Sequence, residues 1–345
     1  MAEEETTAAD SLPPNSSAVA ALVEILAARR LRVSWFERWH ADLEGALREL
    51  PEMPTCPHEL YRQLIETAGI LPKRVALVTE HDTPVAVIGL RREPTQWLPV
   101  TSWVAPGSIA PHRTGYLVAA FAALRMPVKV AWWHESEPPP VGACLQVSAR
   151  IPTHKLTCEG DFEAYWRQSG QMKHILRARK KCAAFQVVVN HPGANEWAIN
   201  GAGRKWAPPG LAWIPGMRDK LTAARYWEPR QRLISVSLLD GERIAASANG
   251  FALGRELVGL TNYREPEYDR LGVGHRVFDA LLWCARERGF EKLDFGGGHE
   301  YKSGYAPEDG ARWQLTFAPD GIEALRVGRA LLTHMRRLVA SRASG

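Results

Sequence analysis

Residues 268–304 place a glycine turn, an amphipathic helix, a short strand and a polar loop in one continuous segment. Gly272 and Gly274 keep the turn free of side chains where the helix begins, so successive backbone N–H groups can point at an anion. Apolar residues at helical spacing continue the helix, and Gly289 is predicted to end it as a C-terminal cap. The segment therefore predicts that a phosphate group binds where this helix begins.

The polar loop follows a short strand predicted over residues 293–295. Three glycines at 296–298 let the backbone pass close to a ligand, and they are followed directly by His299, Glu300, Tyr301 and Lys302. These side chains form a dense set of proton-transfer groups, so the loop is the part of the chain where we expect chemistry.

This segment resembles the C-terminal half of a GNAT-superfamily acyltransferase. It is most similar to the branch of cellulose-biosynthesis-type acetyltransferases, which is related to Fem-type transferases that move amino acids from aminoacyl-tRNA onto peptidoglycan precursors. The pattern that carries the resemblance is Asp294, Phe295, Gly298, Tyr301 and Lys302, with one residue fewer after the glycine than is usual.

The resemblance extends to residues 162–189, where an aromatic entry precedes a basic helix, and in total it covers about half of the chain. It implies an α/β (α+β mixed-sheet) fold built from tandem GNAT-like units, of which the first is degenerate. It also implies acyl-CoA as a co-substrate and no metal. The turn residues that would contact the coenzyme are Arg270, Leu271, Gly272, Val273, Gly274 and His275.

Asp269 departs from the family pattern, because the usual pyrophosphate loop has Gln or Arg three residues before its first glycine. Arg270 comes one residue too late to fill that place. A carboxylate that faces a pyrophosphate would repel it. We therefore expect either that Asp269 points away or that the loop does not hold coenzyme A in the ordinary manner.

Five residues are candidates for catalysis, and each has a structural alternative. Lys302 is expected to stabilise the oxyanion that forms when an amine attacks a carbonyl, or to form a salt bridge with Asp294 or Glu300. Asp294 would orient His299 or Lys302, or accept the amine proton, and His299 would act as the base or cap backbone groups. By resemblance, a tyrosine would protonate the leaving thiolate. Its structural alternative is to pack against the rest of the loop. The two candidates are Tyr301 and Tyr305.

Three further residues are candidates for substrate binding. Lys173 and Arg177 lie on one face of the basic helix, where they would bind a phosphate or a substrate carboxylate, or form a solvated surface. Trp166, just before this helix, would line the cleft or belong to the core.

Length and composition fit a two-unit globular protein. The chain has 345 residues, of which 46% are hydrophobic and 23% are charged, and a net charge of +5 favours phosphate-bearing partners. Its five cysteines form no C-x-x-C pair, which argues against a disulfide framework or a zinc site and fits a cytoplasmic protein. No apolar run is long enough to span a membrane.

Residues 1–17 are acidic and polar and are predicted to be a disordered tail, followed by units over 18–145 and 146–345 that connect within about 136–152. In the first unit we expect helices at 18–32, 34–50, 57–68 and 117–124, a hairpin at 75–79 and 85–90, and a strand at 128–132. In the second we expect one helix at 161–184, strands at 186–190 and 256–261, irregular or loosely helical chain at 201–229, a hairpin at 233–239 and 244–253, and a basic helix at 321–340.

These features predict an N-acyltransferase that moves an acyl group, most simply acetyl, from acyl-CoA to an amine by direct attack. The acceptor would be a small molecule or an envelope precursor. One alternative is a Fem-like aminoacyltransferase that uses aminoacyl-tRNA, which the basic helices favour. A second is a non-catalytic GNAT-fold protein of polysaccharide or envelope biosynthesis, for which Asp269 is the best support.

Overall fold

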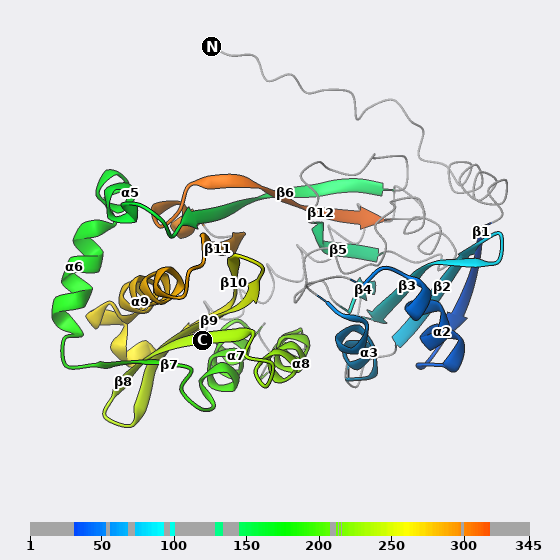
Figure 1. Cartoon of the computed structure of the whole chain (residues 1–345), viewed down its shortest axis with the longest axis horizontal. Helices are drawn as coiled ribbons and strands as arrows, with labels where there is room; N and C mark the ends of the chain where they lie inside the picture. Colours follow the sequence, from blue (N-terminus) through cyan, green and yellow to red (C-terminus); the bar gives the residue numbers. More distant parts are fainter. Residues whose placement is uncertain are drawn as a thin grey trace, which may run out of the picture.

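A computed structural model of the protein describes residues 31–52, 56–67, 73–92, 97–100, 128–133, 145–207, 212, 214, 216–297 and 300–317. Within this part of the chain, twelve strands form one sheet in the order β1-β2-β3-β4-β5-β12-β6-β11-β10-β9-β8-β7 (Figure 1). The pairs β4·β5 and β10·β11 are parallel and the other neighbours are antiparallel. The predicted α/β (α+β mixed-sheet) class is confirmed.

The N-terminal elements occupy one end of this sheet. They are β1 (Leu31–Phe36), α2 (Ala41–Glu49), α3 (His58–Thr67), β2 (Lys73–Glu80), β3 (Thr83–Arg92), β4 (Trp97–Pro99) and β5 (Val128–Trp133). Strands β2 and β3 form the predicted hairpin, and both turn residues, His81 and Asp82, have positive φ angles of 52° and 65°. Such a turn matches the twist of the strands that it joins.

The predicted helix at 34–50 is wrong in its first part, because residues 34–36 belong to β1. This strand alternates polar and apolar residues and pairs along its whole length with β2, and that pairing outweighs its weak helical pattern. Helix α2 begins only after His40, whose side chain accepts a hydrogen bond from the N–H of Asp42. The predicted helix at 18–32 likewise gives way to β1 at its last two residues.

The C-terminal elements carry the segments that the sequence singles out. They are β6 (Leu145–Thr157), α5 (Phe162–Gln168), α6 (Met172–Lys181), β7 (Gln186–Val189), α7 (Ala194–Lys205), α8 (Met217–Trp227), β8 (Leu233–Asp240), β9 (Arg243–Leu253), β10 (Glu256–Arg264), α9 (Val273–Glu287), β11 (Lys292–Gly297) and β12 (Glu308–Phe317). The predicted hairpin around Asp240 and Gly241 is confirmed as β8 and β9, and Gly241 has a φ of 61°.

One prediction in this part of the chain is wrong. The single helix expected over 161–184 is two helices, α5 and α6, because Gly170 turns the chain with a φ of 76°. The stretch 201–229, expected to be irregular or loosely helical, contains the end of α7 and all of α8. Gly201 lies in α7, which packs on β9 and β10, and the buried Trp227 lies in α8, which packs against α3 and α7.

Gly201 lets α7 approach the sheet closely, and replacing it tests how much this close packing contributes to the free energy of unfolding. A Cβ atom built on Gly201 would lie 2.2 Å from the ring of Tyr263 on β10. We expect Gly201→Ala to lower the free energy of unfolding by about 1–3 kcal/mol, because the ring must move. Gly45→Ala is the control, since nothing lies within 4 Å of that site in α2, and it should raise stability by about 0.5–1 kcal/mol. Urea denaturation measures both, and equal effects would contradict the proposed role of close packing.

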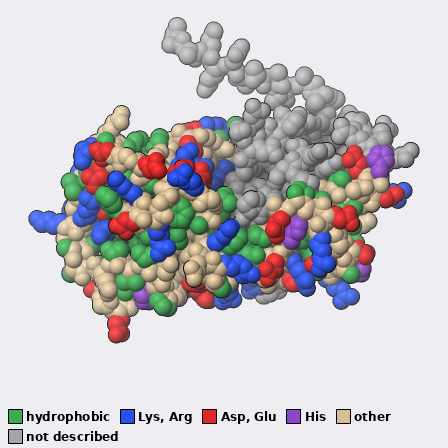
Figure 2. Space-filling view, in the orientation of Figure 1, with side chains coloured by type: hydrophobic (Ala, Val, Ile, Leu, Met, Phe, Trp, Pro, Cys, Tyr) green, Lys and Arg blue, Asp and Glu red, His purple; other side chains and the backbone are tan. Residues whose placement is uncertain are grey.

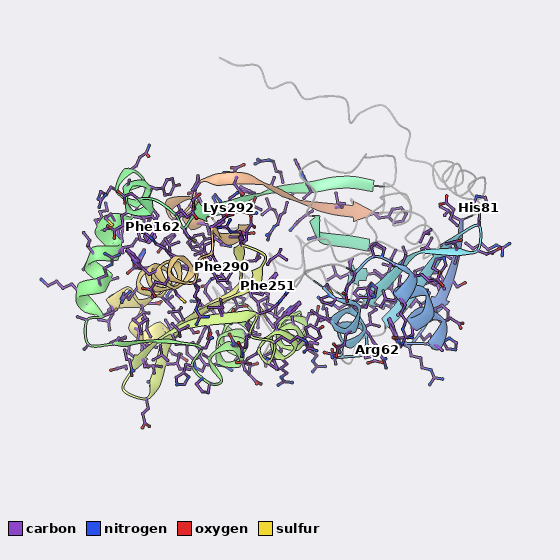
Figure 3. The ribbon with its side chains drawn as sticks, viewed as in Figure 1. Arg62, His81, Phe162, Phe251, Phe290 and Lys292 are labelled. Atoms are coloured by element: carbon purple, nitrogen blue, oxygen red, sulfur yellow. The ribbon has the colours of Figure 1, made fainter. Side chains whose placement is uncertain are left out.

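The two core clusters lie on opposite faces of the sheet. Leu257 packs in the cluster that contains α9, whereas Val258 packs in the cluster that contains α8 and the N-terminal helices. Adjacent residues of a strand point to opposite faces. Helices α7 and α9 therefore cover opposite sides of β10, and α8 packs beside α7. Figure 3 shows Phe162 and Phe290 beside α9, with His81 at the far end of the molecule.

Strands β6 and β12 join the two ends of the sheet. β6 pairs with β11 on one side and with β12 on the other, and β12 pairs in turn with β5. The connection expected within 136–152 therefore includes strand from residue 145 onward, while the division into units at 145 and 146 stays a prediction. The predicted tail at 1–17 and the helices at 117–124 and 321–340 lie outside the described residues.

Several predicted absences can be compared with the described part of the chain. There, no helix has the length and apolar character needed to cross a membrane. Four cysteines are free and buried, at positions 56, 158, 182 and 284. No group of three His, Cys, Asp or Glu residues in this part is arranged to hold a metal ion. Figure 2 shows basic and acidic side chains interspersed over the coloured surface of one face.

Candidate functional site

A glycine turn opens helix α9. Strand β10 ends at Arg264, a 3₁₀ helix over Pro266–Leu271 follows, and α9 begins at Val273. Gly272 has a φ of 79°, a left-handed conformation that favours glycine. The first N–H groups of a helix have no acceptor within it, and the helix dipole adds positive potential there. The predicted glycine turn at the start of this helix is therefore formed, and anion binding by it stays a prediction.

The carboxylate of Asp269 is paired with a cation of the same turn. Arg264 Nε donates a short hydrogen bond to Asp269 Oδ1, and both side chains are partly exposed. A Cβ atom built on Gly274 would lie 3.3 Å from Arg264 Nη1, so the guanidinium lies against the first turn of α9. The repulsion that the sequence predicts between Asp269 and a phosphate is thus reduced by a residue that the sequence did not single out.

Helix α6 packs against this turn along one face. The Cβ atom of Ala178 would lie 3.3 Å from a Cβ built on Gly272, and Lys181 Nζ donates to the carbonyl of Arg270 at 2.7 Å. The ring of His174 stacks on His275 with centroids 5.3 Å apart. The basic helix that the sequence places near the cleft therefore lies directly beside the glycine turn (Figure 1).

A buried carboxylate holds α6 to α9. Arg179 makes two hydrogen bonds to the buried Asp279, from Nη2 to Oδ1 at 2.7 Å and from Nε to Oδ2 at 2.9 Å. The hydrogen bond to Asp279 is the largest cause of a raised pKa for Arg179. Such a bidentate pair fixes geometry as well as charge, so it positions the helix over the turn.

Strands β10 and β11 pair with each other over a short distance and then diverge. Their parallel pairing joins residues 256–258 to 292–294, although β10 continues to Arg264 and β11 to Gly297. A register shift in the pairing of β10 with β9 falls at the same level, between Gly259 and Thr261. The main-chain groups beyond this point are therefore available to side chains from neighbouring elements.

Asp294 is held firmly at the end of the paired region of β11. Its side chain is buried, with Oδ1 accepting from the N–H of Gly296 and Oδ2 accepting from Arg312 Nη2 at 3.0 Å. Because both oxygens have donors within the protein, the orienting role that the sequence predicted as one possibility fits this geometry better than proton transfer.

Lys302 is buried at the same end of β11. It is 9% exposed, and its Nζ donates to the carbonyl of Gly297 at 2.9 Å. Burial, and then the charges of Arg312 and Lys220, lower the pKa of Lys302 to about 8, while Asp294 opposes them. The expected salt bridge to Asp294 or Glu300 is absent, since neither described carboxylate lies within 4.0 Å of this nitrogen.

Lys220 reaches the divergent strands from α8, on the opposite face of the sheet to α9. Its Nζ donates to the carbonyl of Leu260 at 2.7 Å and to Thr261 Oγ1 at 3.3 Å. Burial lowers the pKa of Lys220 to about 8. Two lysines of weakened basicity are therefore directed at the carbonyls of β10 and β11 where these strands separate.

Tyr305 and His275 connect the polar loop to the glycine turn. The Tyr305 hydroxyl forms a short hydrogen bond with His275 Nδ1. Burial is the main cause that raises the pKa of Tyr305, and burial followed by the nearby His174 and Arg264 lowers that of His275. The phenol is therefore protonated and the imidazole neutral near pH 7, so Tyr305 can donate a proton.

Hydrogen bonds hold the 3₁₀ turn over Glu300–Gly304 against α5 and the residue that follows it. Trp166 Nε1 donates to the carbonyl of Tyr305 at 3.1 Å, and Tyr165 Oη donates to that of Ser303 at 2.6 Å. Ser169 Oγ donates to the carbonyl of Gly304 at 2.7 Å. Trp166 is fully buried, so it fits the core alternative rather than a cleft wall.

The remaining predicted site residues are more exposed. Tyr301 is 47% exposed, and its ring meets that of Tyr305 edge-on with centroids 6.4 Å apart. Burial raises the pKa of Tyr301, while Asn262 and Arg264 lower it. Lys173 and Arg177 are exposed on α6, and His299 lies outside the described residues.

The structure brings together Asp294, Lys302, Tyr305 and His275 from the predicted set. It adds three cations that sequence reasoning missed, namely Arg264, Lys220 and Arg312. Arg264 could have been found, because it ends the strand that leads into the glycine turn, but the predicted strand stopped at residue 261. Lys220 lies in a segment expected to be irregular or loosely helical, and Arg312 comes from a strand that was not predicted. No local pattern indicated either of them.

Residues 169–305 match the family model described as an acetyltransferase (GNAT) domain. This range contains α6, the glycine turn, α9, β11 and the loop through Tyr305. The match supports acyltransferase chemistry in the C-terminal part of the chain. No curated protein is significantly similar to the chain.

Solved structures resemble the chain at low identity. They include a tandem GNAT protein from the clavulanic acid biosynthesis pathway, with 13% identity over 84% of this chain and 98% of that one, at a TM-score of 0.47. L-PGS from Bacillus licheniformis has 13% sequence identity, covers 84% of this chain and 97% of its own, and has a TM-score of 0.47. FemX has 10% sequence identity, covers 81% of this chain and 96% of its own, and has a TM-score of 0.43. These values are too low to transfer an activity or a branch of the family to this chain.

Proposed function

We propose that the chain is an N-acyltransferase that moves an acyl group, most simply acetyl, from acyl-CoA to an amine without a covalent enzyme intermediate. The observation that carries this proposal is the connection between the glycine turn and the polar loop, made by the hydrogen bond between His275 and Tyr305. The match of residues 169–305 to an acetyltransferase domain supports it.

The glycine turn offers hydrogen-bond donors and positive charge to a pyrophosphate. Helix α9 offers its first N–H groups, and Arg264 adds a guanidinium against Gly274. Helix N-termini and arginine side chains are the groups that most often bind phosphate oxygens in proteins. Arg264 would thus perform the task that the usual Gln or Arg of the loop performs elsewhere, although Asp269 shares its charge.

In the reaction, the neutral amine attacks the thioester carbon, and its nitrogen passes a proton to solvent or a nearby base as the C–N bond forms. The carbonyl oxygen becomes negative, and the C–S bond then breaks. Lys302 stabilises the oxyanion, because its ammonium group is held in a buried site where charge interactions are strong.

Tyr305 would return a proton to the departing thiolate. Its hydroxyl is protonated and in contact with neutral His275. The tyrosinate left by this transfer regains a proton from solvent through His275, whose Nδ1 gives up a proton as its Nε2 takes one up. Asp294 and Arg312 keep the strand end and Gly296 in place rather than exchanging protons. The products are the amide and free coenzyme A.

Calorimetric titration with acetyl-CoA and a longer acyl-CoA tests the donor. We expect saturable binding that is lost in Gly274→Trp, whose indole would fill the start of α9 and displace Arg264. Arg264→Gln should weaken binding by about tenfold, the usual value of one charge-assisted hydrogen bond. Arg243→Gln, on the exposed β8–β9 hairpin, is the control. Binding that survives Gly274→Trp unchanged would place the donor elsewhere.

An aminoacyl-tRNA donor is the second candidate, which the exposed Lys173 and Arg177 beside the turn favour. In that case the chain would not bind acyl-CoA, would bind charged tRNA, and would lose activity on ribonuclease treatment. A chain that binds neither donor and tolerates replacement of both Lys302 and Asp294 would be a non-catalytic protein of the same fold.

The pH dependence of turnover should report the protonation of Lys302. Its pKa is lowered to about 8, so the cation is complete below this pH and is lost as the pH rises through it. We expect kcat to fall on the alkaline side. Lys220→Met removes a positive charge that lowers the pKa of Lys302, so the fall should move to higher pH.

The matching control for this pH profile is Lys292→Met, which removes an exposed lysine at the start of β11. Its profile should coincide with that of the wild type. An alkaline fall that stays at the same pH in Lys220→Met would show that Lys302 is not the group that titrates.

A further inference from the structure

Three cations gather where β10 and β11 diverge. A Cβ atom built on Gly296 would lie 3.6 Å from both Lys302 Nζ and Arg312 Nη1, so these two nitrogen atoms are at most twice that distance apart. Lys220 Nζ donates to the carbonyl of Leu260, which lies two residues past the last residue of β10 that pairs with β11. Gly296 likewise lies two residues past the end of this pairing on β11, and the charge of Lys220 also lowers the pKa of Lys302. The three side chains come from α8, the turn after β11 and β12, which are separate in sequence.

This cluster has more positive than negative charge. Asp294 is the buried carboxylate in it, and it is committed to Arg312 and to the N–H of Gly296. Lys220 and Lys302 donate instead to the carbonyls of Leu260 and Gly297, which carry no net charge. Buried charges without a counter-charge are unfavourable, and the lowered pKa of each lysine reflects that environment.

Each lysine Nζ has three N–H donors. Among the described residues, Lys302 uses one for the carbonyl of Gly297, and Lys220 uses two, for the carbonyl of Leu260 and for Thr261 Oγ1, so each has at least one donor left. We infer that Lys220 and Lys302, with Arg312 beside them, bind an oxyanion carried by the acceptor, either a carboxylate or a phosphate. This inference rests on the proposed acyl transfer and specifies its second substrate.

The position of Lys220 assigns this anion to the acceptor rather than to the donor. The phosphates of coenzyme A would bind at the start of α9 and Arg264. Lys220 extends from α8, whose residues belong to the core cluster on the face of the sheet opposite to α9, as the alternate burial of Leu257 and Val258 shows. The sheet therefore separates the two anion sites, and Lys302 lies at the strand end between the acceptor group and the reacting carbonyl.

The test measures anion binding with no acyl donor present. Calorimetric titrations at constant ionic strength use succinate as the carboxylate probe and inorganic phosphate as the phosphate probe. We expect saturable binding of at least one probe, and the tighter one identifies the group. Lys220→Met and Lys302→Met should each weaken it by about tenfold or more, because each removes a charged donor.

Arg218→Met is the matched control, since it removes an exposed cation from the same helix two residues away, on a different side. Its binding should equal that of the wild type. Arg264→Gln controls for probes that bind at α9. Failure of both probes to bind, equal losses in Arg218→Met and Lys220→Met, or a loss confined to Arg264→Gln would each overturn the inference.

Turnover separates this inference from the proposed function. With acetyl-CoA as donor, amines are compared in matched pairs such as glycine and glycinamide, or 2-aminoethyl phosphate and 2-aminoethanol. Preference for the anionic member, lost in Lys220→Met through a higher KM, supports the inference. Equal use of both members would refute it while leaving acyl transfer established. If no amine is acylated but Lys220-dependent anion binding persists, the proposed function fails instead.

Discussion

Lys302→Ala should lower kcat by about 10²–10³-fold, the loss that follows removal of one oxyanion-stabilising donor. The ammonium group is buried and held by the carbonyl of Gly297, so it meets the reacting carbonyl without the reorganisation that an exposed lysine would need. Binding of acetyl-CoA should change little, because in the proposed mechanism Lys302 meets the acyl carbonyl, whereas the phosphates bind at the start of α9 and Arg264. Steady-state thiol release measures the first quantity and calorimetry the second.

Lys292→Ala is the control for this variant. It removes a lysine from the first residue of β11, where the side chain is exposed (Figure 3), and should leave kcat unchanged. If Lys302→Ala turned over acyl-CoA at the wild-type rate, Lys302 would be a structural residue of the loop and the mechanism would lose its central group.

Asp219→Ala should lower the free energy of unfolding by about 3–5 kcal/mol, since it would leave a charged arginine buried and unpaired. Asp219 on α8 forms a short ion pair with Arg91 on β3, and both side chains are almost fully buried at 2% and 3% exposure. The pair also joins the N-terminal strands to a helix of the C-terminal part. Urea denaturation followed by circular dichroism measures the effect.

Two comparisons show whether the unpaired charge causes this loss. The double variant Arg91→Met/Asp219→Leu should recover most of the stability, because it removes both charges and keeps the volume. Arg225→Ala breaks an exposed pair with Glu196 and should cost about 0.2–1 kcal/mol. A double variant as unstable as Asp219→Ala would assign the loss to packing instead.

The hairpins were predictable because their turns are local. Asp240-Gly241 and the turn at 81–82 each join two runs of alternating residues, and both became adjacent strands. Local patterns failed where distant partners decided the structure. β1 is a strand because β2 lies beside it, and α7 keeps glycine inside a helix because Tyr263 needs the space.

The candidate site divides in the same way. The glycine turn, α9, Asp294 and the loop through Tyr305 lie within forty residues, so their spacing was sufficient to predict an anion-binding turn followed by a reactive loop. Lys220 and Arg312 come from helix α8 and strand β12, and no periodicity relates them to Lys302. Their convergence depends on the order of strands in the sheet, which is decided by long-range pairing and by which helix covers each face. Short-range hydrogen bonding and side-chain spacing depend on consecutive residues and can be predicted from them. The charges around Lys302 come together only when the chain has folded.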